Sequence, residues 1–533
     1  MAPNWGASGT LLCCLLLLVT TQLQVPAARA QGPDPRLANP VVPGQLYVKY
    51  RKPQGPTAAA AVAAGRGAVP LAAGRVGVTA ATRAGETVAQ ATQRLKADPA
   101  VLEVSPDYWV HATQDTPVMP YTAPADGSSW ALERISAGYA WGKLVIGRTH
   151  TRICIVDSGV DCGHPDLQVR PVVGSSLTRS ACVDGVRYAG GVETKGMAAA
   201  ADEFGHGTKV AGVVAATGDN QGAAGVMYGG AALYVCRFMD KSGWGYASDA
   251  LRCLNWCLSK GASISVNSWG ANLGKLDIEA WSDAKSPPGV FGDMQELLQS
   301  DTVVRTHLFV TASGNDGRQL APRQSSGTYF FVPAQLQAES ILTVGATDIN
   351  DRLWTVPAKR DASTSGSDAA GGSNYGSTFV DVAAPGVSLL TTRLRTAAEA
   401  KKAGTRPVSL VRETGTSFSA ALAGGVAGLV LAAQNYSGVE NGIDMRDVKD
   451  AIVGGADVLP QLTATLPDGQ QQIREGRRLN AYNTLSEYFG ESVFPRLPLQ
   501  LAGKKPQPSP PPPRPPPPQV GVEQMAGWLV PLG

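Results

Sequence analysis

The chain has 533 residues, enough for two or three domains and for at least one large hydrophobic core. Its formal net charge is only +3 and 17% of its residues are charged, so no basic stripe indicates nucleic-acid binding and no acidic tail stands out. The 61 Gly and 38 Pro indicate a loop-rich chain that contains at least one low-complexity segment.

The N-terminal thirty residues have the pattern of a secretory signal peptide. The apolar run Leu11 to Val19 is too short to span a bilayer, and Ala28-Arg29-Ala30 offers small residues at the two positions that signal peptidase reads. We therefore expect residues 1–30 to be a cleaved signal peptide, with a buried N-terminal helix as the alternative. No later stretch predicts a membrane anchor. The expected destination is extracellular or wall- or matrix-associated, with a secretory-pathway compartment as the alternative.

Residues 31–113 form a separate unit that we expect to be a small α+β domain. A strand is expected at Leu46 to Tyr50, behind the turn signal Pro43-Gly44. A helical pattern follows at Glu86 to Ala97, and an apolar segment, Val101 to Tyr108, closes the unit.

From residue 114 to residue 490 the chain alternates apolar strands with helical patterns. This alternation predicts an α/β domain with a mostly parallel central sheet that is covered by helices on both faces. Strands are expected at Arg152 to Asp157, Ala232 to Phe238, Ser263 to Val266, Leu308 to Ala312, Ile341 to Ala346 and Val380 to Ala383, and helices at His206 to Ala216, Ala247 to Lys260 and Ser417 to Ala433.

Three polar residues occupy strand ends or helix starts of this domain. Asp157 ends an apolar strand, His206 begins a helix in Gly-His-Gly-Thr, and Ser417 begins a second helix in Gly-Thr-Ser. A serine hydroxyl is a poor nucleophile at neutral pH unless a base takes its proton, and a histidine held by a carboxylate supplies that base. Taken alone, Asp157 is more typical of a turn residue, His206 of a polar helix start and Ser417 of an N-cap. Together they predict a catalytic triad.

The three motifs, in the chain order Asp, His, Ser, resemble those of the subtilisin-like serine protease family. The resemblance covers residues 46 to 490 and implies a subtilisin-like fold and a serine endopeptidase that acts through an acyl-enzyme. It also implies that residues 31–113 are an inhibitor-I9-type propeptide, which acts as folding template and inhibitor of a self-processing zymogen. The expected cleavage point lies between His111 and Tyr121.

The same resemblance implies roles for further residues. Asn315, in Ser-Gly-Asn after a strand, matches the asparagine whose side chain donates to the oxyanion, together with the backbone N–H of Ser417. Gly-Asn-Asp-Gly is equally typical of a turn. The substrate peptide is expected to pair with two edge segments, made of Ser268, Trp269 and Gly270 and of Gly243, Trp244, Gly245 and Tyr246. The aromatic residues are equally compatible with simple packing. No acidic residue is clearly placed to demand a basic residue in the substrate, so the preference stays open.

No cofactor is required for this chemistry, but the resemblance implies a structural calcium ion. Asp166 and the loop that contains Asp219 match positions where many members of the family bind calcium through carboxylate and backbone oxygens. The run Gly-Asp-Asn-Gln-Gly around Asp219 is equally typical of a plain turn.

Six of the eight cysteines remain after removal of the signal peptide, which contains Cys13 and Cys14. An even number in a secreted chain predicts three disulfides, although six cysteines allow fifteen pairings. Free thiols or a nucleophilic Cys154 are the alternatives. Resemblance to a cysteine-rich branch of the family from protists implies the pairs Cys154–Cys257, Cys236–Cys253 and Cys162–Cys182.

Residues 491–533 form a Pro-rich tail in which the run from Ser509 to Pro518 predicts an extended polyproline spacer. The expected partners of the protein are protein or peptide substrates and its own propeptide, and the mature enzyme is expected to be a monomer. Two other functions compete with proteolysis. One is a catalytically silent matrix protein that keeps the fold; the other is an α/β-hydrolase, disfavoured because Ser417 lacks a Gly-x-Ser-x-Gly elbow.

Overall fold

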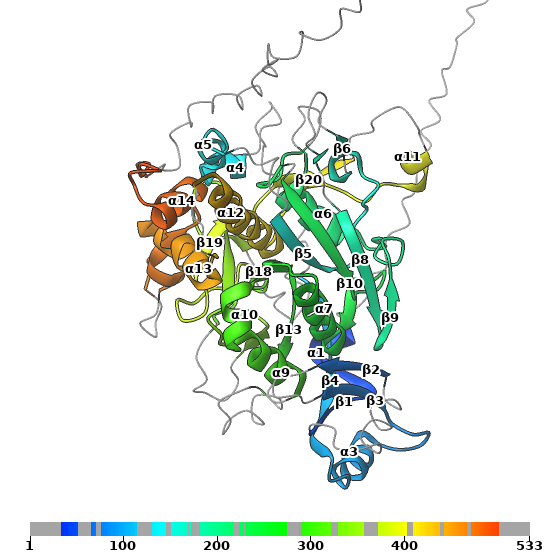
Figure 1. The fold of residues 1–533 in the computed structure, drawn as a ribbon. Helices are drawn as coiled ribbons and strands as arrows, with labels where there is room; N and C mark the ends of the chain where they lie inside the picture. Colours follow the sequence, from blue (N-terminus) through cyan, green and yellow to red (C-terminus); the bar gives the residue numbers. More distant parts are fainter. Residues whose placement is uncertain are drawn as a thin grey trace, which may run out of the picture.

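The computed structural model describes most of the chain between residues 34 and 499 (Figure 1). The predicted signal peptide, residue 219 of the predicted calcium loop and the run from Ser509 to Pro518 lie outside the described residues. The described ranges are 34–51, 66–70, 76–113, 130–144, 151–168, 170–171, 178–179, 182–217, 223–228, 230–273, 287, 289–320, 329–356, 371–401, 409–437, 442–465 and 471–499.

A mostly parallel sheet forms the centre of the larger domain. Neighbouring strands from β23 to β8 run parallel, and β22 and β9 add one antiparallel strand at each edge. Strands β14 and β16 are buried at every residue, as expected for parallel strands that are covered on both faces. Within the described residues the strand order is β22 (Asp457–Val458), β23 (Arg477–Arg478), β19 (Val382–Pro385), β16 (Ile341–Thr347), β14 (Leu308–Ala312), β12 (Ile264–Asn267), β5 (Thr151–Asp157), β10 (Ala231–Arg237), β8 (Cys182–Ala189) and β9 (Val192–Lys195).

Helices cover both faces of this sheet. Because successive side chains of a strand point to opposite faces, Ile153 and Ile155 of β5 lie in one core cluster, whereas Cys154 and Val156 lie in another. The first cluster contains residues of α6 (His206–Ala215), α12 (Thr416–Ser437), α13 (Met445–Gly454) and α14 (Ala481–Phe489). The second contains residues of α7 (Ala247–Ser259), α9 (Gly289–Leu298) and α10 (Asp301–Thr306).

Helix α12 is long and apolar enough over Thr416–Gln434 to cross a membrane, but 94% of its most apolar window is buried inside the protein. It contacts α6 and strands β12, β14, β16 and β19. Its hydrophobicity on all sides is therefore that of a central core helix.

The N-terminal unit is the expected small α+β domain. Strand β1 (Val41–Tyr50) lies between β3 (Val76–Ala81) and β4 (Val101–Ala112), all antiparallel, and β2 (Arg66–Pro70) pairs with the other side of β3. Helix α3 (Val88–Lys96) packs on β1 and β4. Leu46, Val48, Val78 and Ala91 belong to the small core between helix and sheet.

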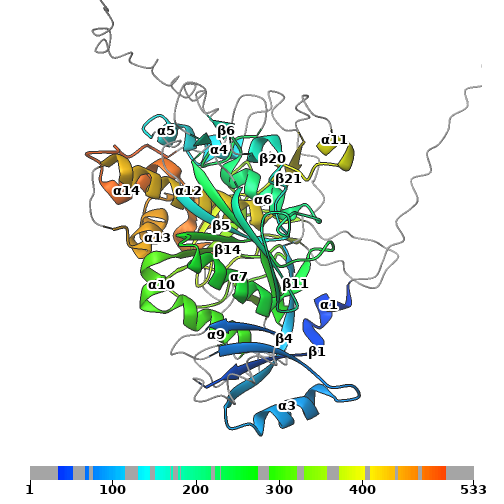
Figure 2. The same ribbon diagram turned by 45° about the vertical axis from the view of Figure 1, so that its right-hand side comes forward.

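Strand β4 continues beyond the N-terminal unit into the larger domain, where it pairs with β11 (Trp244–Tyr246) and β13 (Trp269–Leu273). Strand β15 (Phe330–Val332) pairs with the other side of β13. Figure 2 shows the β1 and β4 strands below α7 and beside α9. The remaining short elements are α1 (Pro35–Ala38), α4 (Trp130–Arg134), α5 (Ala137–Trp141), η3 (Pro165–Leu167), β6 (Arg170–Pro171), β7 (Thr178–Arg179), β17 (Thr355–Val356), β18 (Gly371–Gly372), β20 (Leu389–Thr392), α11 (Ala397–Lys401), β21 (Leu410–Glu413), η4 (Pro460–Leu462) and η5 (Arg474–Gly476).

Two carboxylates of β4 meet helix N-termini of the larger domain. Asp107 accepts a hydrogen bond from the backbone N–H of Ser248, 3.1 Å away in the first turn of α7, and a second from the Ser248 hydroxyl. Glu103 accepts one from the N–H of Gly289, 2.5 Å away at the start of α9. Negative charge is favourable at a helix N-terminus, so both contacts stabilise the docking of the two domains.

Within the part of the chain that the structure describes, three disulfides are present, and they join the pairs that the resemblance implies. Cys154–Cys257 connects β5 to α7, Cys236–Cys253 connects β10 to α7, and Cys162–Cys182 closes the loop before β8. The alternative of a nucleophilic Cys154 is wrong in this structure because its sulfur is already bonded.

Candidate active site

The structure brings Asp157, His206 and Ser417 together at the carboxyl end of β5. His206 Nδ1 lies 2.8 and 2.9 Å from the two carboxylate oxygens of Asp157, and its Nε2 lies 3.0 Å from Ser417 Oγ. His206 is the first residue of α6, and Ser417 lies in the first turn of α12. All three side chains are buried. This arrangement can carry a proton from the hydroxyl to the imidazole while the carboxylate holds the ring.

Two glycines beside His206 allow the strand and the helix to approach. Gly205 precedes the helix with φ +103°, a conformation that L side chains rarely adopt. A Cβ on Gly207 would collide with the backbone oxygen of Gly159, in the loop that follows Asp157. The Gly-His-Gly pattern therefore has a steric reason.

Asp202 and Ser158 position the triad and were not predicted as site residues. The Asp202 carboxylate accepts hydrogen bonds from the N–H groups of Phe204 (3.0 Å) and Gly205 (2.7 Å) and from both the N–H (3.0 Å) and the hydroxyl (2.6 Å) of Thr208. It also accepts the Ser158 hydroxyl at 2.9 Å, and Ser158 Oγ accepts the N–H of Gly207 at 2.9 Å. Burial raises the pKa of Asp202, whereas these donors lower it. An Asp shortly before a helix start was the available sequence signal.

Asn315 lies beside the start of α12. Its Oδ1 accepts hydrogen bonds from the N–H of Thr416 at 2.9 Å and from the Thr416 hydroxyl at 2.7 Å. These bonds fix the orientation of the amide, with Oδ1 toward Thr416 and the Nδ2 donors on the other side of the group. The arrangement can supply a donor to a developing oxyanion.

Both predicted substrate-binding segments contact β4, which occupies the cleft between them. In the antiparallel registers, His111 faces Trp244 on one side and Gly270 on the other, and Trp269 faces Ala112. The N–H of Ala112 donates to the carbonyl of Gly243 at 3.0 Å, and the N–H of Thr113 donates to the carbonyl of Ser268 at 3.1 Å. Gly245 pairs with Val110. Main-chain pairing of this kind is how an extended peptide binds to a sheet edge.

Thr113, the residue that directly follows β4, contacts the candidate nucleophile and was missed as a site residue. Its hydroxyl makes a short contact with Ser417 Oγ, which also donates toward the Thr113 carbonyl oxygen at 3.4 Å. Thr113 is buried, and Ser417 has no exposed surface. The chain therefore blocks its own candidate active site.

The predicted calcium site can be assessed only in part, because Asp219 lies outside the described residues. The carboxylate of Asp166 is buried and accepts the N–H of Ala223 at 3.1 Å, and its carbonyl accepts the N–H of Thr217 at 3.0 Å. Among the described residues no group of three or more His, Cys, Asp or Glu side chains could hold a metal. A single carboxylate supplies far fewer than the roughly six to eight oxygens that calcium prefers. Calcium binding therefore stays a prediction.

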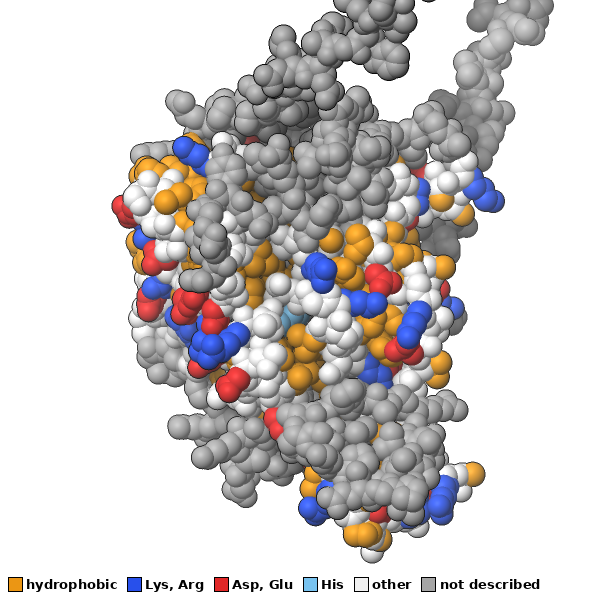
Figure 3. Space-filling model, viewed as in Figure 1, with side chains coloured by type: hydrophobic (Ala, Val, Ile, Leu, Met, Phe, Trp, Pro, Cys, Tyr) orange, Lys and Arg blue, Asp and Glu red, His pale blue; other side chains and the backbone are white. Residues whose placement is uncertain are grey.

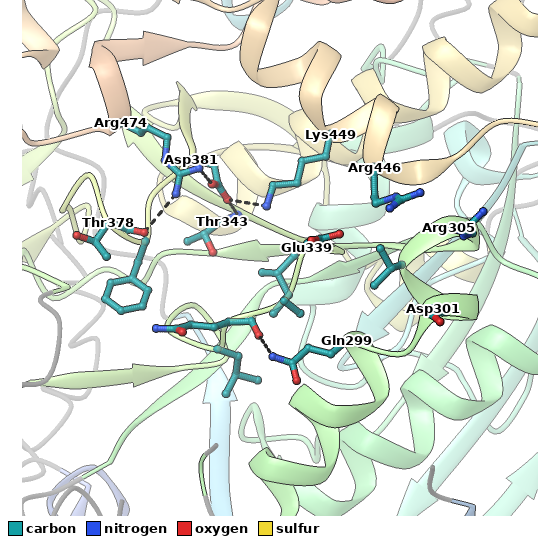
Figure 4. Close-up of a pocket in the computed structure, with 16 residues that line it drawn as sticks. Gln299, Asp301, Arg305, Glu339, Thr343, Thr378, Asp381, Arg446, Lys449 and Arg474 are labelled. Atoms are coloured by element: carbon teal, nitrogen blue, oxygen red, sulfur yellow. Dashed lines mark hydrogen bonds and ion pairs between the residues drawn. The ribbon is translucent and has the colours of Figure 1, made fainter. Parts of the chain in front are cut away.

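A separate pocket of about 650 Å³ lies at the amino ends of β16 and β19 (Figure 4). Asp157 lies at the other ends of the parallel strands, the carboxyl ends. Four charged side chains of the pocket are paired: Asp381 binds Arg474 at 2.8 Å and Lys449 at 3.8 Å, and Arg446 binds Asp444 at 2.7 Å. Figure 3 shows acidic and basic side chains interspersed on the surface over α10 and α13. Paired charges of this kind do not indicate a ligand site.

Comparison with known proteins agrees with this geometry. The peptidase S8 family, described as "Subtilase family", matches residues 148–490. Halolysin of Haloferax mediterranei is 30% identical over 321 residues, which are 60% of this chain and 48% of that protein. Subtilisin E of Bacillus subtilis is 26% identical over 303 residues, 57% of this chain and 61% of that protein. The chain thus spans about half to three-fifths of the length of these relatives.

Among solved structures, fervidolysin of Fervidobacterium pennivorans, described as a keratinolytic enzyme related to subtilisin, matches with a TM-score of 0.55. The match covers 84% of this chain and 61% of that chain at 19% sequence identity, and it shows the fold alone. The family match covers more than half of the 533 residues. The chain therefore belongs to the subtilase family.

Proposed function

We propose that this subtilase is a serine endopeptidase that is made as a self-inhibited, self-processing zymogen. The observation that carries the proposal is the unbroken series of hydrogen-bonding contacts from Asp157 through His206 to Ser417. A catalytically silent protein would have no need to keep both Asp157 and Ser417 within 3.0 Å of the His206 ring in a buried cluster.

In the proposed reaction, Ser417 Oγ attacks a peptide carbonyl while His206 Nε2 takes the hydroxyl proton. His206 then gives that proton to the leaving amine, which departs with the C-terminal part of the substrate. Water, deprotonated by His206, hydrolyses the acyl-serine ester and restores the hydroxyl. Asp157 holds the imidazole with Nδ1 protonated and stabilises the imidazolium that forms.

Asn315 Nδ2 and the backbone N–H of Ser417 are the proposed donors to the oxyanion of the tetrahedral intermediate. The hydrogen bonds from Thr416 to Asn315 Oδ1 support this role because they hold the amide in one orientation before the reaction. The equivalent donor of subtilisin contributes about 2.7–4 kcal/mol to transition-state stabilisation, and we expect a similar value here.

The N-terminal unit, which the structure describes over residues 34–51, 66–70 and 76–113, is the proposed inhibitory propeptide, and the Thr113–Gln114 peptide bond is the proposed cleavage point. The contact between the Thr113 carbonyl and Ser417 supports this assignment, as does the main-chain pairing that draws β4 through the cleft. This bond lies within the interval expected from the sequence. Substrates would bind in the same register after the propeptide leaves.

Secretion, with removal of residues 1–30, is the proposed route of the protein. The three disulfides support it, because such bonds persist in oxidising compartments and are rare in the cytosol. Calcium at the loop near Asp166 remains an additional proposal without a described ligand set.

The test combines a serine-directed probe with the identity of the new N-terminus. The full chain, after activation, is treated with a fluorophosphonate probe, and its fragments are analysed by mass spectrometry. We expect labelling at Ser417, a mature chain that begins at Gln114, and loss of both in the Ser417→Ala variant. A folded wild-type protein that is neither labelled nor cleaved would refute the proposed activity.

A further inference from the structure

Trp244 lies directly opposite a specific residue of the strand that occupies the cleft. Its register partner in β4 is His111, the third residue upstream of the proposed cleavage point when Thr113 is counted as the first. The two rings have centroids 4.8 Å apart and planes inclined by 47°. Trp244 is only 3% exposed in this state. The indole of Trp244 therefore packs directly against the His111 side chain.

A cation from another segment lies over the same indole. The guanidinium carbon of Arg36, in α1, is 4.2 Å from the centroid of the Trp244 ring and 5.5 Å from that of Trp109. Both distances fall within the range of cation–π attraction. Trp244 thus contacts both the imidazole of His111 and the guanidinium of Arg36.

An acidic side chain, Asp240, lies next to the backbone of Trp244. Asp240, exposed in the turn before β11, accepts hydrogen bonds through Oδ1 from the N–H groups of Ser242 (2.8 Å) and Trp244 (3.2 Å). Hydrogen bonding by Asp34 is the main cause of the raised pKa of Arg36, and the charge of Asp240 adds to it. Burial lowers the pKa of His111, while its hydrogen bond to the Ala112 carbonyl and, to a smaller extent, the charges of Asp316 and Asp34 oppose that shift. Two acids of the larger domain, Asp240 and Asp316, therefore bias this region toward positive charge.

We propose, on the basis of the proposed endopeptidase function, that Trp244 and Asp240 form a subsite that favours a planar cationic side chain at the third residue upstream of the cleaved bond. Arginine is the preferred residue and histidine the next. When the propeptide leaves, both His111 and Arg36 depart with it, and the indole face becomes accessible to a substrate. A guanidinium can stack on the ring and be attracted by Asp240, whereas a glutamate is repelled by Asp240 and Asp316.

The expected size of the preference follows from the strength of cation–π contacts. Such a contact changes the rate by about twofold at an exposed site and by about thirtyfold at a desolvated one. We expect about a tenfold higher kcat/KM for arginine than for alanine at this position. The sequence pattern alone could not reveal this, because Asp240 and Trp244 are four residues apart in a turn whose geometry brings them together.

The test uses the full chain after self-processing and four internally quenched peptides with the sequence Val-Xaa-Ala-Thr before a common leaving segment. Val, Ala and Thr copy Val110, Ala112 and Thr113. Xaa is Arg, His, Ala or Glu. We expect kcat/KM to fall in that order. The Arg-to-Ala ratio should fall toward one in Trp244→Leu, which keeps a large apolar side chain without the ring.

Asp240→Asn is the matched electrostatic variant, because the amide oxygen can still accept the hydrogen bonds of the turn. It should lower the Arg-to-Glu ratio at least threefold. Ratios are compared within each variant, so a general loss of activity does not affect the result. If Trp244→Leu does not fold, the wild-type ranking and Asp240→Asn still decide the question.

Equal rates for the four peptides with the wild-type enzyme would overturn the subsite proposal, and so would ratios that are unchanged in the variants. Either result would leave the proposed endopeptidase function standing, since the peptides are cleaved. Failure to cleave any peptide, with no probe labelling of Ser417, would instead refute the proposed function, and with it the subsite.

Discussion

The carbonyl oxygen of Thr113 lies 3.4 Å from the hydroxyl oxygen of Ser417, although 304 residues separate them along the chain. The N–H of Thr113 is held by the carbonyl of Ser268 at 3.1 Å. One residue is therefore fixed at its amide and faces the candidate nucleophile with its carbonyl.

Replacement of Thr113 by proline should slow self-cleavage at least tenfold. Proline has no N–H to donate to Ser268, and its fixed φ disfavours the observed register. Thr113→Ser is the control, because it keeps both the N–H and the hydroxyl, and it should process at nearly the wild-type rate. The measurement is a time course of chain cleavage on gels. Unaltered cleavage of Thr113→Pro after residue 113 would show that this register is not the productive one.

Replacement of Asp202 by alanine should destabilise the domain by about 2–4 kcal/mol, because five donors, four of them buried, lose their acceptor. Urea unfolding in a Ser417→Ala background avoids self-digestion and measures this loss. Asp202→Asn, which keeps one carbonyl oxygen, should lose less. If the alanine variant unfolds at the wild-type urea concentration, the carboxylate does not anchor the start of α6.

Loss of the Asp107 carboxylate should weaken retention of the cleaved N-terminal unit about ten- to a hundred-fold. The reason is the loss of charged hydrogen bonds at the N-terminus of α7, each of which contributes about 1.5–3 kcal/mol. Gel filtration of processed Asp107→Ala should find more separated fragment than in the wild type. Glu86→Gln is the matched control, since Glu86 pairs with Arg94 within the same unit. Equal retention in the two variants would contradict the role of the helix cap.

His307 should make the domain less stable in acid. Burial lowers the pKa of His307 to about 4, and its neutral ring donates from Nδ1 to the Ala262 carbonyl at 2.7 Å and contacts the Ser265 hydroxyl through Nε2 at 2.8 Å. The stability that neutral His307 contributes to the fold is fully present above about pH 6.5. As pH falls from 6.5 to 4, the unfolded chain binds a proton that the folded chain does not, which removes about 3 kcal/mol.

The measurement is the free energy of unfolding of Ser417→Ala protein at pH 7 and pH 4.5, with and without His307→Gln. The substitution should lower stability at pH 7 and reduce the loss between the two pH values. The buried His111 and His164 contribute acid sensitivity of the same sign, so only the difference between the two proteins reports on His307. A loss of equal size in both would contradict the assignment.

Much of the fold could be predicted because the central strands are continuous apolar runs. Strands β14 and β16 begin where the sequence predicts, and α12 starts one residue before the predicted Ser417 because Asn315 holds the N–H of Thr416. The hairpin of β8 and β9 was not predicted, since β9 is exposed throughout and has no apolar face. Helix α13 was also missed, although Asp444 caps it and Met445, Val448 and Ile452 have helical spacing.

The candidate triad could be predicted because each member stands in a short local pattern. Contacts between distant segments could not be predicted, because no local sequence signal links Thr113 to Ser417 or Arg36 to Trp244. The choice between packing and substrate contact for Trp244 also needed coordinates. The indole is buried against Arg36 and His111, which belong to the proposed propeptide and not to the core of the larger domain.

Strand β4 lies upstream of the Thr113–Gln114 bond, whereas the strands β11 and β13 that it pairs with, and the two helices that Asp107 and Glu103 contact, lie downstream of it. Cleavage of this bond would therefore leave all of these contacts intact. The N-terminal unit would remain bound, but as a separate chain. The appearance of activity would then follow the escape of that chain, and simple dilution should shorten the lag, because recapture depends on concentration whereas the cut itself does not.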